Sequence, residues 1–227
     1  MTRAGHLSTH VVAAAVIDLA GRVLIAQRPP GKHLAGGWEF PGGKLEAGED
    51  RRAGLARELR EELGIALIAP SRPLIRVRHR YDYGAVLIDM WVVRRYSGEP
   101  RGLDGQALRW CTRAELDSVE MLPADGPIVA ALRLPERLTQ ASTPDYALGR
   151  SPSGDAAGRL HGVWCSSAAD ALAASDAGAD FLALRYELAR EELRSICALV
   201  AVPVYATGVA MEEAWETGAT GIAEIGE

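Results

Sequence analysis

The chain has 227 residues, of which 48% are hydrophobic and 24% are charged, and its formal net charge is −5. This length suffices for one large domain or for a domain with a smaller partner, and the composition is typical of a soluble globular protein. The negative net charge argues against a general nucleic-acid binder, because such proteins usually present a basic surface. The three cysteines are odd in number and lack CxxC spacing, which predicts free thiols in a reducing cytoplasm: Cys111, Cys165 and Cys197.

Two apolar, β-rich runs come first, at residues 10–17 and 23–27, and a turn separates them. This spacing predicts a short hairpin. The run 11–20 also resembles the core of a signal peptide, but Asp18 interrupts it and Gly21 follows at once, so we favour the hairpin. No run approaches the roughly 18 apolar residues of a membrane span, and we therefore expect no membrane association.

A helix is predicted over residues 50–63, where Gly64 supplies the usual C-terminal stop. Its apolar side chains form one stripe, so one face packs and the neighbouring face stays available: Leu55, Ala56, Leu59 and Leu63. Two strands and two short helices are expected further on, at 74–80, 85–95, 113–117 and 126–133. Because strands and helices do not strictly alternate, we predict an α+β sandwich with α/β/α layers through about residue 135.

Residues 139–158 are rich in Ser, Gly, Pro and Ala and are predicted to form a linker. Beyond them, strand-like and helix-like segments alternate, which is typical of a parallel sheet or of part of a (β/α) barrel. We therefore expect a first domain at 1–138, the linker, and a four-unit βα segment at 159–227.

Within the predicted helix, Glu58 lies three and four positions before Glu61 and Glu62, so the three carboxylates share one flank. Like charges at this spacing cost roughly 0.2–0.5 kcal/mol per pair. A solvated helix in which Arg57 pairs with Glu61 is one explanation. A bound cation is the other, because Mg²⁺ prefers oxygen ligands and often joins carboxylates to substrate phosphates.

This helix is part of a longer motif, GKLEAGEDRRAGLARELREELGI, at residues 43–65. Written as G-x5-E-x7-R-E-U-x-E-E-x-G-U, with U a bulky aliphatic residue, it resembles the Nudix box without a departure. The matching residues are Gly43, Glu49, Arg57, Glu58, Leu59, Glu61, Glu62, Gly64 and Ile65. The resemblance implies a Nudix sandwich and a metal-dependent hydrolase, and it favours the bound cation over the solvated helix.

The resemblance also implies the ligands of Mg²⁺, or of Mn²⁺ as the alternative cation: Glu58, Glu61 and Glu62. Which of these also acts as the general base stays open. By the same resemblance, Glu49 and Arg57 form the pair that holds the helix to the preceding loop. The glycines at 42–43 let the backbone approach the metal, which makes Gly42 a further candidate ligand, and Lys44 can meet a phosphate as a point charge.

The flanking segments resemble the MutT branch of this family, the bacterial 8-oxo-dGTP diphosphatases, over about residues 9–136. They are LIAQRPPGKHLAGGWEFPGGK, RGLDGQALRW and LPADGPIVAALRLP, at 24–44, 101–110 and 122–135. In that branch, water cleaves a nucleoside triphosphate into a nucleoside monophosphate and pyrophosphate. The resemblance implies that Arg28 contacts the substrate and that Asp104, where Glu is usual, is an additional metal or base carboxylate.

Asp125 stands where the branch has an asparagine that contacts the purine edge through one donor and one acceptor. An ionised Asp only accepts hydrogen bonds, so it would repel O6 of guanine. Three explanations stay open: Asp125 is protonated, the base sits differently, or the preferred base is not guanine. A plain turn residue before Gly126 and Pro127 is the structural alternative.

The C-terminal sequences HGVWCSSAADALAASDAGADFLALR and VPVYATGVAMEEAWETGATGIAEI resemble the last half of thiamine-phosphate synthase/TenI-like barrels. About 70 residues supply four βα units where a barrel needs eight. The early strands of that family, with their diphosphate and metal ligands, are absent, so we expect no synthase activity. A half-barrel leaves an edge and an apolar face to be covered, which predicts an interface with the first domain or a homodimer.

Together these features predict a cytoplasmic, Mg²⁺-dependent nucleoside triphosphate pyrophosphohydrolase that converts 8-oxo-dGTP to 8-oxo-dGMP and pyrophosphate and so cleanses the nucleotide pool. The expected partner is the nucleoside triphosphate, without a nucleic-acid polymer or a membrane. One alternative is a Nudix hydrolase of another diphosphate, such as a cytidine nucleotide or a thiamine-pathway pyrophosphate, which the C-terminal segment favours. The other alternative is a non-catalytic binding protein that keeps the motif as a relic.

Overall fold

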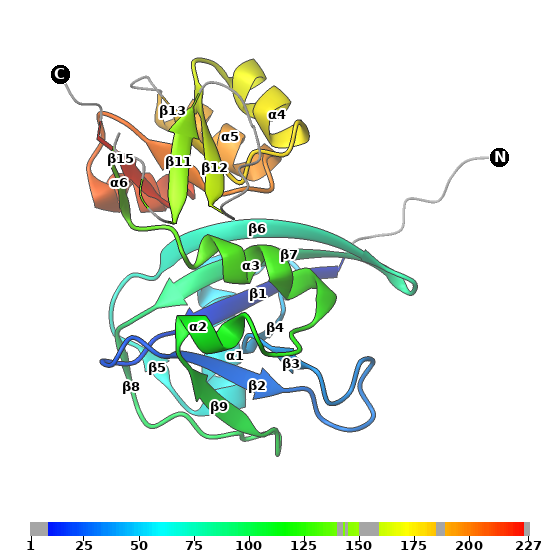
Figure 1. Cartoon of the computed structure of the whole chain (residues 1–227). Coiled ribbons are helices and arrows are strands. Elements are labelled where there is room, and N and C mark those ends of the chain that lie inside the picture. Colours follow the sequence, from blue (N-terminus) through cyan, green and yellow to red (C-terminus); the bar gives the residue numbers. More distant parts are fainter. Residues whose placement is uncertain (1–8, 140–142, 144, 150–158, 185–188, 225–227) are drawn as a thin grey trace. The chain divides into compact units, whose positions relative to one another are not determined.

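The computed structural model describes residues 9–139, 143, 145–149, 159–184 and 189–224 (Figure 1). The chain divides into two compact units, one made of Met1–Arg72 and Val77–Val129 and the other of Pro73–Arg76 and Ala130–Glu227. The domain boundaries expected from the sequence stay a prediction. No helix in the described part of the chain is long and apolar enough to cross a membrane.

Three sheets build the first unit. The largest has the strand order β4-β1-β7-β6, in which β1 runs parallel to β7 and antiparallel to β4. Its strands are β1 (Thr9–Val16), β4 (Gly42–Lys44), β6 (Arg72–Tyr81) and β7 (Gly84–Val93). The other two sheets have the orders β3-β2-β9 and β5-β8. Their strands are β2 (Val23–Gln27), β3 (Trp38–Glu39), β5 (Ala66–Leu67), β8 (Tyr96–Ser97) and β9 (Leu108–Cys111).

The hairpin expected at the start of the chain is wrong, because its two strands enter different sheets. β1 pairs with β4 and β7, whereas β2 pairs with β3 and β9. An isolated antiparallel bridge between Ile17 and Val23 joins them next to the turn, and the Asp18 carboxylate accepts hydrogen bonds from the backbone of Ala20 and Arg22. Two apolar runs around a turn look the same in sequence whether the strands stay paired or diverge.

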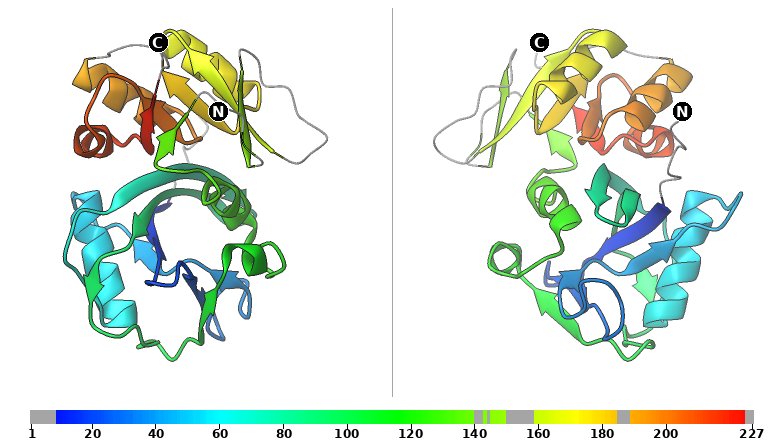
Figure 2. Two further views of the ribbon diagram at one scale, coloured as in Figure 1. Left: turned by 60° about the vertical axis from the view of Figure 1, so that its left-hand side comes forward. Right: turned by 90° about the vertical axis from the view of Figure 1, so that its right-hand side faces the viewer.

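Helix α1 (Arg51–Leu63) lies along one side of these sheets, and α2 (Arg113–Leu116) and α3 (Gly126–Ala131) lie on the other (Figure 2). The expected α/β/α layers are therefore present. The Asp50 side chain caps the start of α1 by accepting from the backbone of Arg52 and Ala53, and Gly64 ends the helix at φ 69°. The stripe packs as predicted, with the side chains of Leu55, Leu59 and Leu63 fully buried against β1 and β7, although Ala56 is only half-buried.

The second unit contains a parallel sheet with the order β10-β15-β14-β13-β12-β11. Its strands are β10 (Arg137–Leu138), β11 (Tyr146–Gly149), β12 (Leu160–Cys165), β13 (Phe181–Leu184), β14 (Val204–Ala206) and β15 (Gly221–Ala223). Helices α4 (Ala168–Asp176), α5 (Arg190–Leu199) and α6 (Met211–Thr217) pack on one face of it. On the other face, the rings of Tyr146 and Tyr205 meet Phe181 edge-on, with centroids 5.8 and 5.9 Å apart.

The predicted alternation beyond residue 159 is observed as β12-α4-β13-α5-β14-α6-β15, and the sheet is a curled parallel half-barrel. The sheet is two strands wider than expected. Strand β11 falls inside the expected linker 139–158, of which 140–142, 144 and 150–158 lie outside the described residues, and β10 falls at the end of the expected first domain. Such short segments carry little periodicity, so only their pairing with β12 and β15 makes them strands.

Candidate active site

The carboxylate flank of α1 faces the two glycines of β4. A Cβ atom at Gly42 would lie 2.2 Å from the carbonyl oxygen of Val12, and one at Gly43 would lie 2.3 Å from Oε2 of Glu58. Gly42 also has φ 149°, a backbone conformation that L side chains rarely adopt. Glycine at both positions therefore lets β4 approach β1 and α1 closely, and the backbone amide of Gly42 donates to Oε2 of Glu62 at 3.0 Å.

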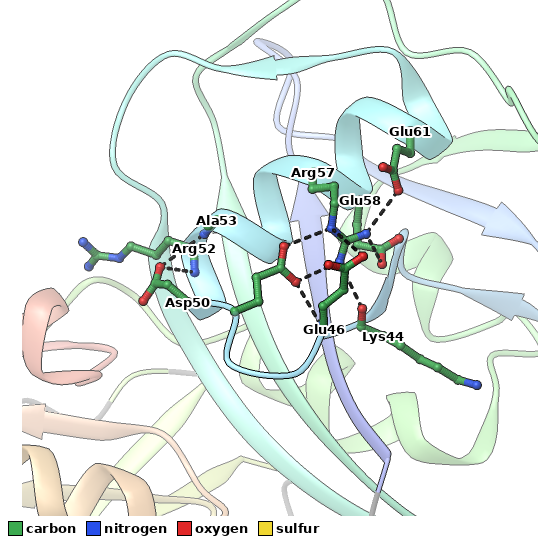
Figure 3. Close-up of polar contacts among 9 residues, drawn as sticks. Lys44, Glu46, Asp50, Arg52, Ala53, Arg57, Glu58 and Glu61 are labelled. Carbon is green, nitrogen blue, oxygen red and sulfur yellow. Dashed lines mark hydrogen bonds and ion pairs between the residues drawn. The ribbon is translucent and has the colours of Figure 1, made fainter.

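Arg57 is the hydrogen-bonding centre of this region (Figure 3). Its Nε and Nη2 each donate to one oxygen of Glu49 at 2.9 Å, which makes the paired fork expected from the sequence. Its Nη1 donates to Glu58 at 2.9 Å and to Glu61 at 3.1 Å, and Nη2 also donates to the carbonyl oxygen of Lys44 at 3.1 Å. The hydrogen bonds from Arg57 lower the pKa of Glu49 to about 2, so this pair is ionised at neutral pH.

The three glutamates differ in their surroundings. Glu61 is mostly exposed, with 60% of its side-chain surface accessible, while Glu58 keeps only 12%. Burial raises the pKa of Glu62 to about 7, and the neighbouring charge of Glu58 adds to this rise, although the hydrogen bond from Gly42 opposes it. The surroundings of Glu62 therefore disfavour its charged form.

Within the described residues, no three His, Cys, Asp or Glu side chains gather as a ready metal cage. Glu58 and Glu61 bond Arg57, and Glu62 bonds the Gly42 amide. The donors nevertheless suit a hard cation, because carboxylate oxygens on one rigid helix line a cavity together with the glycines of β4. A bound cation would offset both the burial and the neighbouring negative charge of Glu58 that together raise the pKa of Glu62.

A cavity of about 760 Å³ connects the predicted site residues. Its wall includes one group of residues at the Nudix motif: Gly42, Gly43, Lys44, Glu58, Glu61, Glu62 and Asp104. It also includes a second group: Arg28, Glu39, Tyr81, Leu122, Ala124 and Asp125. The structure therefore brings every predicted metal and substrate residue to one cavity. Glu49 and Arg57 lie outside its lining, where their hydrogen bonds join α1 to the preceding loop.

Asp104 reaches this cavity from the loop before β9. The side chain of Gln106 ties that loop to the end of α1, because its Nε2 donates to the carbonyl oxygen of Glu62 at 3.1 Å. The Gln106 Oε1 atom in turn accepts from the backbone amide of Asp104 at 2.8 Å. Asp104 thereby joins the three glutamates of α1 in the cavity wall.

Asp125 ends the short 3-10 helix η1 (Pro123–Asp125), and its side chain points into the protein with a residue exposure of 5%. Burial raises its pKa to about 8; the charge of Glu39 acts in the same direction, and Arg28 opposes both. At about pH 7 the carboxyl is therefore protonated, with one hydrogen-bond donor and one acceptor. Of the three explanations that the sequence left open, this favours the protonated one.

Sequence reasoning missed Glu39, which pairs with Arg28 through Nη1 and Oε2 at 2.5 Å. It also missed Tyr81 and Tyr83, whose rings stack with centroids 5.0 Å apart and line the cavity beside Asp125. The alternation of Tyr, Asp and Tyr at 81–83 was the available signal, but alternation alone does not tell which face of a strand meets a ligand.

Residues 12–131 of the chain match the family model described as "NUDIX domain". The chain belongs to this family. The predicted enzyme class, a Nudix pyrophosphohydrolase, is thereby confirmed for the first unit. The family generally uses a divalent metal, which agrees with the oxygen donors of α1.

Three curated relatives illustrate the match. A protein of Mycobacterium tuberculosis named "Putative 8-oxo-dGTP diphosphatase 2" is 42% identical over 54% of this chain and 86% of its own length. The "CTP pyrophosphohydrolase" of Escherichia coli is 40% identical over 53% of this chain and 88% of its own. The "8-oxo-dGTP diphosphatase" of Escherichia coli is 34% identical over 49% and 85%. These matches span about half of this chain and leave the second unit uncovered.

Among solved structures, the MutT protein from Methanosarcina mazei Go1 resembles the chain with a TM-score of 0.51 at 22% identity. The similarity covers 57% of this chain and 93% of that protein. At this identity the likeness concerns the fold alone. It supports the Nudix fold predicted for the first unit.

The Arg57 network yields a first prediction. An Arg57→Lys substitution keeps the charge but loses the planar fork that holds Glu49, Glu58 and Glu61. Because groups that orient metal ligands typically contribute 10–100-fold, we expect the rate of pyrophosphate release from a nucleoside triphosphate with Mg²⁺ to fall by about ten-fold or more.

The exposed Arg60 on the same helix provides the control, since Arg60→Lys changes the same chemistry away from the cavity. An Arg57→Lys protein that matches the rate of Arg60→Lys would show that the network does not position the glutamates.

Proposed function

We propose that the protein is an Mg²⁺-dependent hydrolase that cleaves 8-oxo-dGTP with water to 8-oxo-dGMP and pyrophosphate. The observation that carries this proposal is the burial of Asp125 in the same cavity as the Nudix glutamates, a burial that raises the pKa of its carboxyl to about 8. Two of the three relatives described above are named for the same substrate, at 42% and 34% identity. The mycobacterial name is itself qualified as putative.

The choice of base follows from the hydrogen-bonding capacity of a neutral carboxyl group. Its O–H can donate to O6 of 8-oxoguanine, and its C=O can accept from the N7–H that oxidation at C8 creates. Unmodified guanine offers acceptors at both O6 and N7, so it leaves the carboxyl C=O without a partner. A buried polar group left unpaired is a strong basis for rejection of the wrong substrate.

A cytidine nucleotide is the second candidate, and the same side chain favours it. A neutral Asp125 can donate to N3 of cytosine and accept from the N4 amino group. The relative named "CTP pyrophosphohydrolase" is 40% identical to the chain. A thiamine-pathway pyrophosphate has no comparable support in the described residues, and the non-catalytic alternative is set aside because the first unit belongs to a family of hydrolases.

For the metal we propose Mg²⁺, with Mn²⁺ as the alternative, and with these ligands: Glu58, Glu61, Glu62, Asp104 and the backbone of Gly42. When bound, the cation neutralises phosphate charge and acidifies the attacking water. Arg57 bonds both Glu49 and the carbonyl oxygen of Lys44, the last residue of β4, and the side chain of Lys44 lines the cavity as a cation for phosphate oxygens. Arg28 lines the part of the cavity next to Asp125, where its pairing with Glu39 holds it beside the base.

For the second unit we propose a shortened thiamine-phosphate synthase/TenI-like origin with four βα units and no synthase activity, in a protein that resides in the cytoplasm. We also propose that the half-barrel forms a homodimer. Size-exclusion chromatography with light scattering is expected to give twice the mass of 24.2 kDa. A constant monomer mass across the concentration range would contradict this.

The base assignment predicts a specific pH dependence. Asp125 loses its proton as pH rises through about 8, and each further pH unit reduces the protonated fraction about ten-fold. An Asp125→Asn variant always keeps one donor and one acceptor. We therefore compare kcat/KM for 8-oxo-dGTP between the variant and the wild type. The value for Asp125→Asn divided by the wild-type value is expected to stay constant below about pH 8 and to rise at higher pH.

The measurement is pyrophosphate release from 8-oxo-dGTP, dGTP and CTP between about pH 6.5 and 9.5, with the exposed Asp117→Asn as the control. A preference for CTP would favour the second candidate. Turnover of none of these triphosphates would refute the proposed function.

The ligand assignment predicts that Glu61→Gln and Glu62→Gln each reduce the rate with Mg²⁺ by about 100-fold or more, because an amide binds a hard cation more weakly than a carboxylate does. Glu99→Gln serves as the control, since Glu99 pairs with Arg101 on the surface. An undiminished rate in either cavity variant would remove that residue from the site.

A further inference from the structure

The cavity wall carries more acidic groups than cations that are free to meet a ligand. Its cationic side chains are Arg28, Lys32 and Lys44. Arg28 is already occupied, because Nη1 bonds Glu39 and Nε donates to the carbonyl oxygen of His33 at 2.6 Å. In the described part of the chain, no carboxylate lies within 4.0 Å of the ammonium group of Lys32 or Lys44.

Lys32 is carried by the loop between β2 and β3, and this loop has a defined shape. Backbone hydrogen bonds close its base, from Arg28 N to Gly37 O and from Gly36 N to Arg28 O, both at 2.9 Å. Its tip is held from the other side, because the His33 ring meets the Tyr83 ring edge-on at 4.5 Å. The loop is therefore anchored on both sides of the exposed Lys32, at Arg28 and at His33.

Lys32 lies where the main cavity meets a small recess behind it. Both spaces share the residues Lys32, Glu39, Phe40, Gly42, Glu62 and Asp104. Burial raises the pKa of both Glu39 and Glu62, and the positive charge of Lys32 opposes part of each rise, so its ammonium group acts on both carboxyls. Glu39 belongs to the Asp125 side of the cavity and Glu62 to the Nudix motif, which puts Lys32 between the two.

A nucleotide whose base meets Asp125 and whose terminal phosphates meet the Nudix glutamates must pass its first phosphate between these two groups. We propose that Lys32 binds the α-phosphate, the phosphate that remains on the nucleoside monophosphate after cleavage. An ammonium group suits this role, because it attracts phosphate oxygens as a point charge and needs no fixed two-pronged geometry. This inference rests on the proposed function, but it does not depend on which base is preferred.

The assignment separates Lys32 from Lys44. Lys44 follows the two glycines of β4, next to Glu58, and so belongs to the part of the cavity that takes the terminal phosphates. After cleavage those phosphates leave as pyrophosphate. The two lysines are therefore expected to affect the two products differently, and each provides the matched control for the other.

The test is isothermal titration calorimetry of the full chain with Mg²⁺, using 8-oxo-dGMP, dCMP and pyrophosphate as separate ligands. One of the two monophosphates is expected to bind the wild type. Lys32→Gln is expected to reduce the affinity for that monophosphate by about ten-fold, since a hydrogen bond to a charged group contributes that much or more. Its affinity for pyrophosphate stays unchanged, and Lys32→Arg restores most of the loss. Lys44→Gln is expected to show the reverse preference.

Thermal unfolding followed by circular dichroism verifies that each variant is folded. A Lys32→Gln protein that binds the monophosphate as tightly as wild type, or that loses pyrophosphate affinity equally, would overturn the assignment of Lys32 alone. Wild-type protein that binds neither monophosphate would overturn both this assignment and the proposed function.

Discussion

The guanidinium of Arg57 joins three acidic side chains and one backbone carbonyl, and the order of the whole Nudix motif depends on it. It holds Glu49 through two parallel hydrogen bonds, and it reaches Glu58 and Glu61 through the third nitrogen. Without this cation, the carboxylates on α1 would repel one another. The lowered pKa of Glu49 means that the pair contributes to stability above about pH 4.5 and loses that contribution as pH falls toward about 2.

The carboxyl groups in the cavity and next to it differ in pKa because their surroundings differ. Arg57 keeps Glu49 ionised, burial raises the pKa of Glu62 to about 7, and stronger burial raises that of Asp125 to about 8. The cavity therefore has one region suited to hydrogen-bond recognition, at Asp125, and another at the Nudix glutamates that suits a cation. This difference explains how an Asp can take the place of an amide without losing the pairing of donor and acceptor.

The loop between β2 and β3 connects these two regions. Arg28 at its start contacts Glu39, and His33 at its tip contacts Tyr83. Lys32 between them is left to face the cavity. The loop thus contributes both a base-side arginine and a free ammonium group, and it does so through contacts that are distant from the Nudix motif in sequence.

The second unit shows how much of a fold can be predicted from local sequence pattern. Three strand–helix pairs and the strand after them follow from alternating apolar runs, because each run is long enough to show its period. Strands β10 and β11 escaped prediction because they are short, and only pairing with β15 and β12 defines them. The error at β1 and β2 has the same origin, since a turn between two apolar runs does not specify which neighbours the strands choose.

The amino-acid sequence by itself determined the helix with its C-terminal glycine, the apolar stripe, and the spacing of Arg57, Glu58, Glu61 and Glu62, because these depend on residues within two or three helical turns. It also indicated the family, through a motif contained in one continuous segment. Only the tertiary structure decided that Asp125 is buried where Glu39 adds to the rise in its pKa, and that Lys32 lines the same cavity as the carboxylates. Those properties arise from desolvation and from charges contributed by separate segments, and neither is visible until the chain is folded.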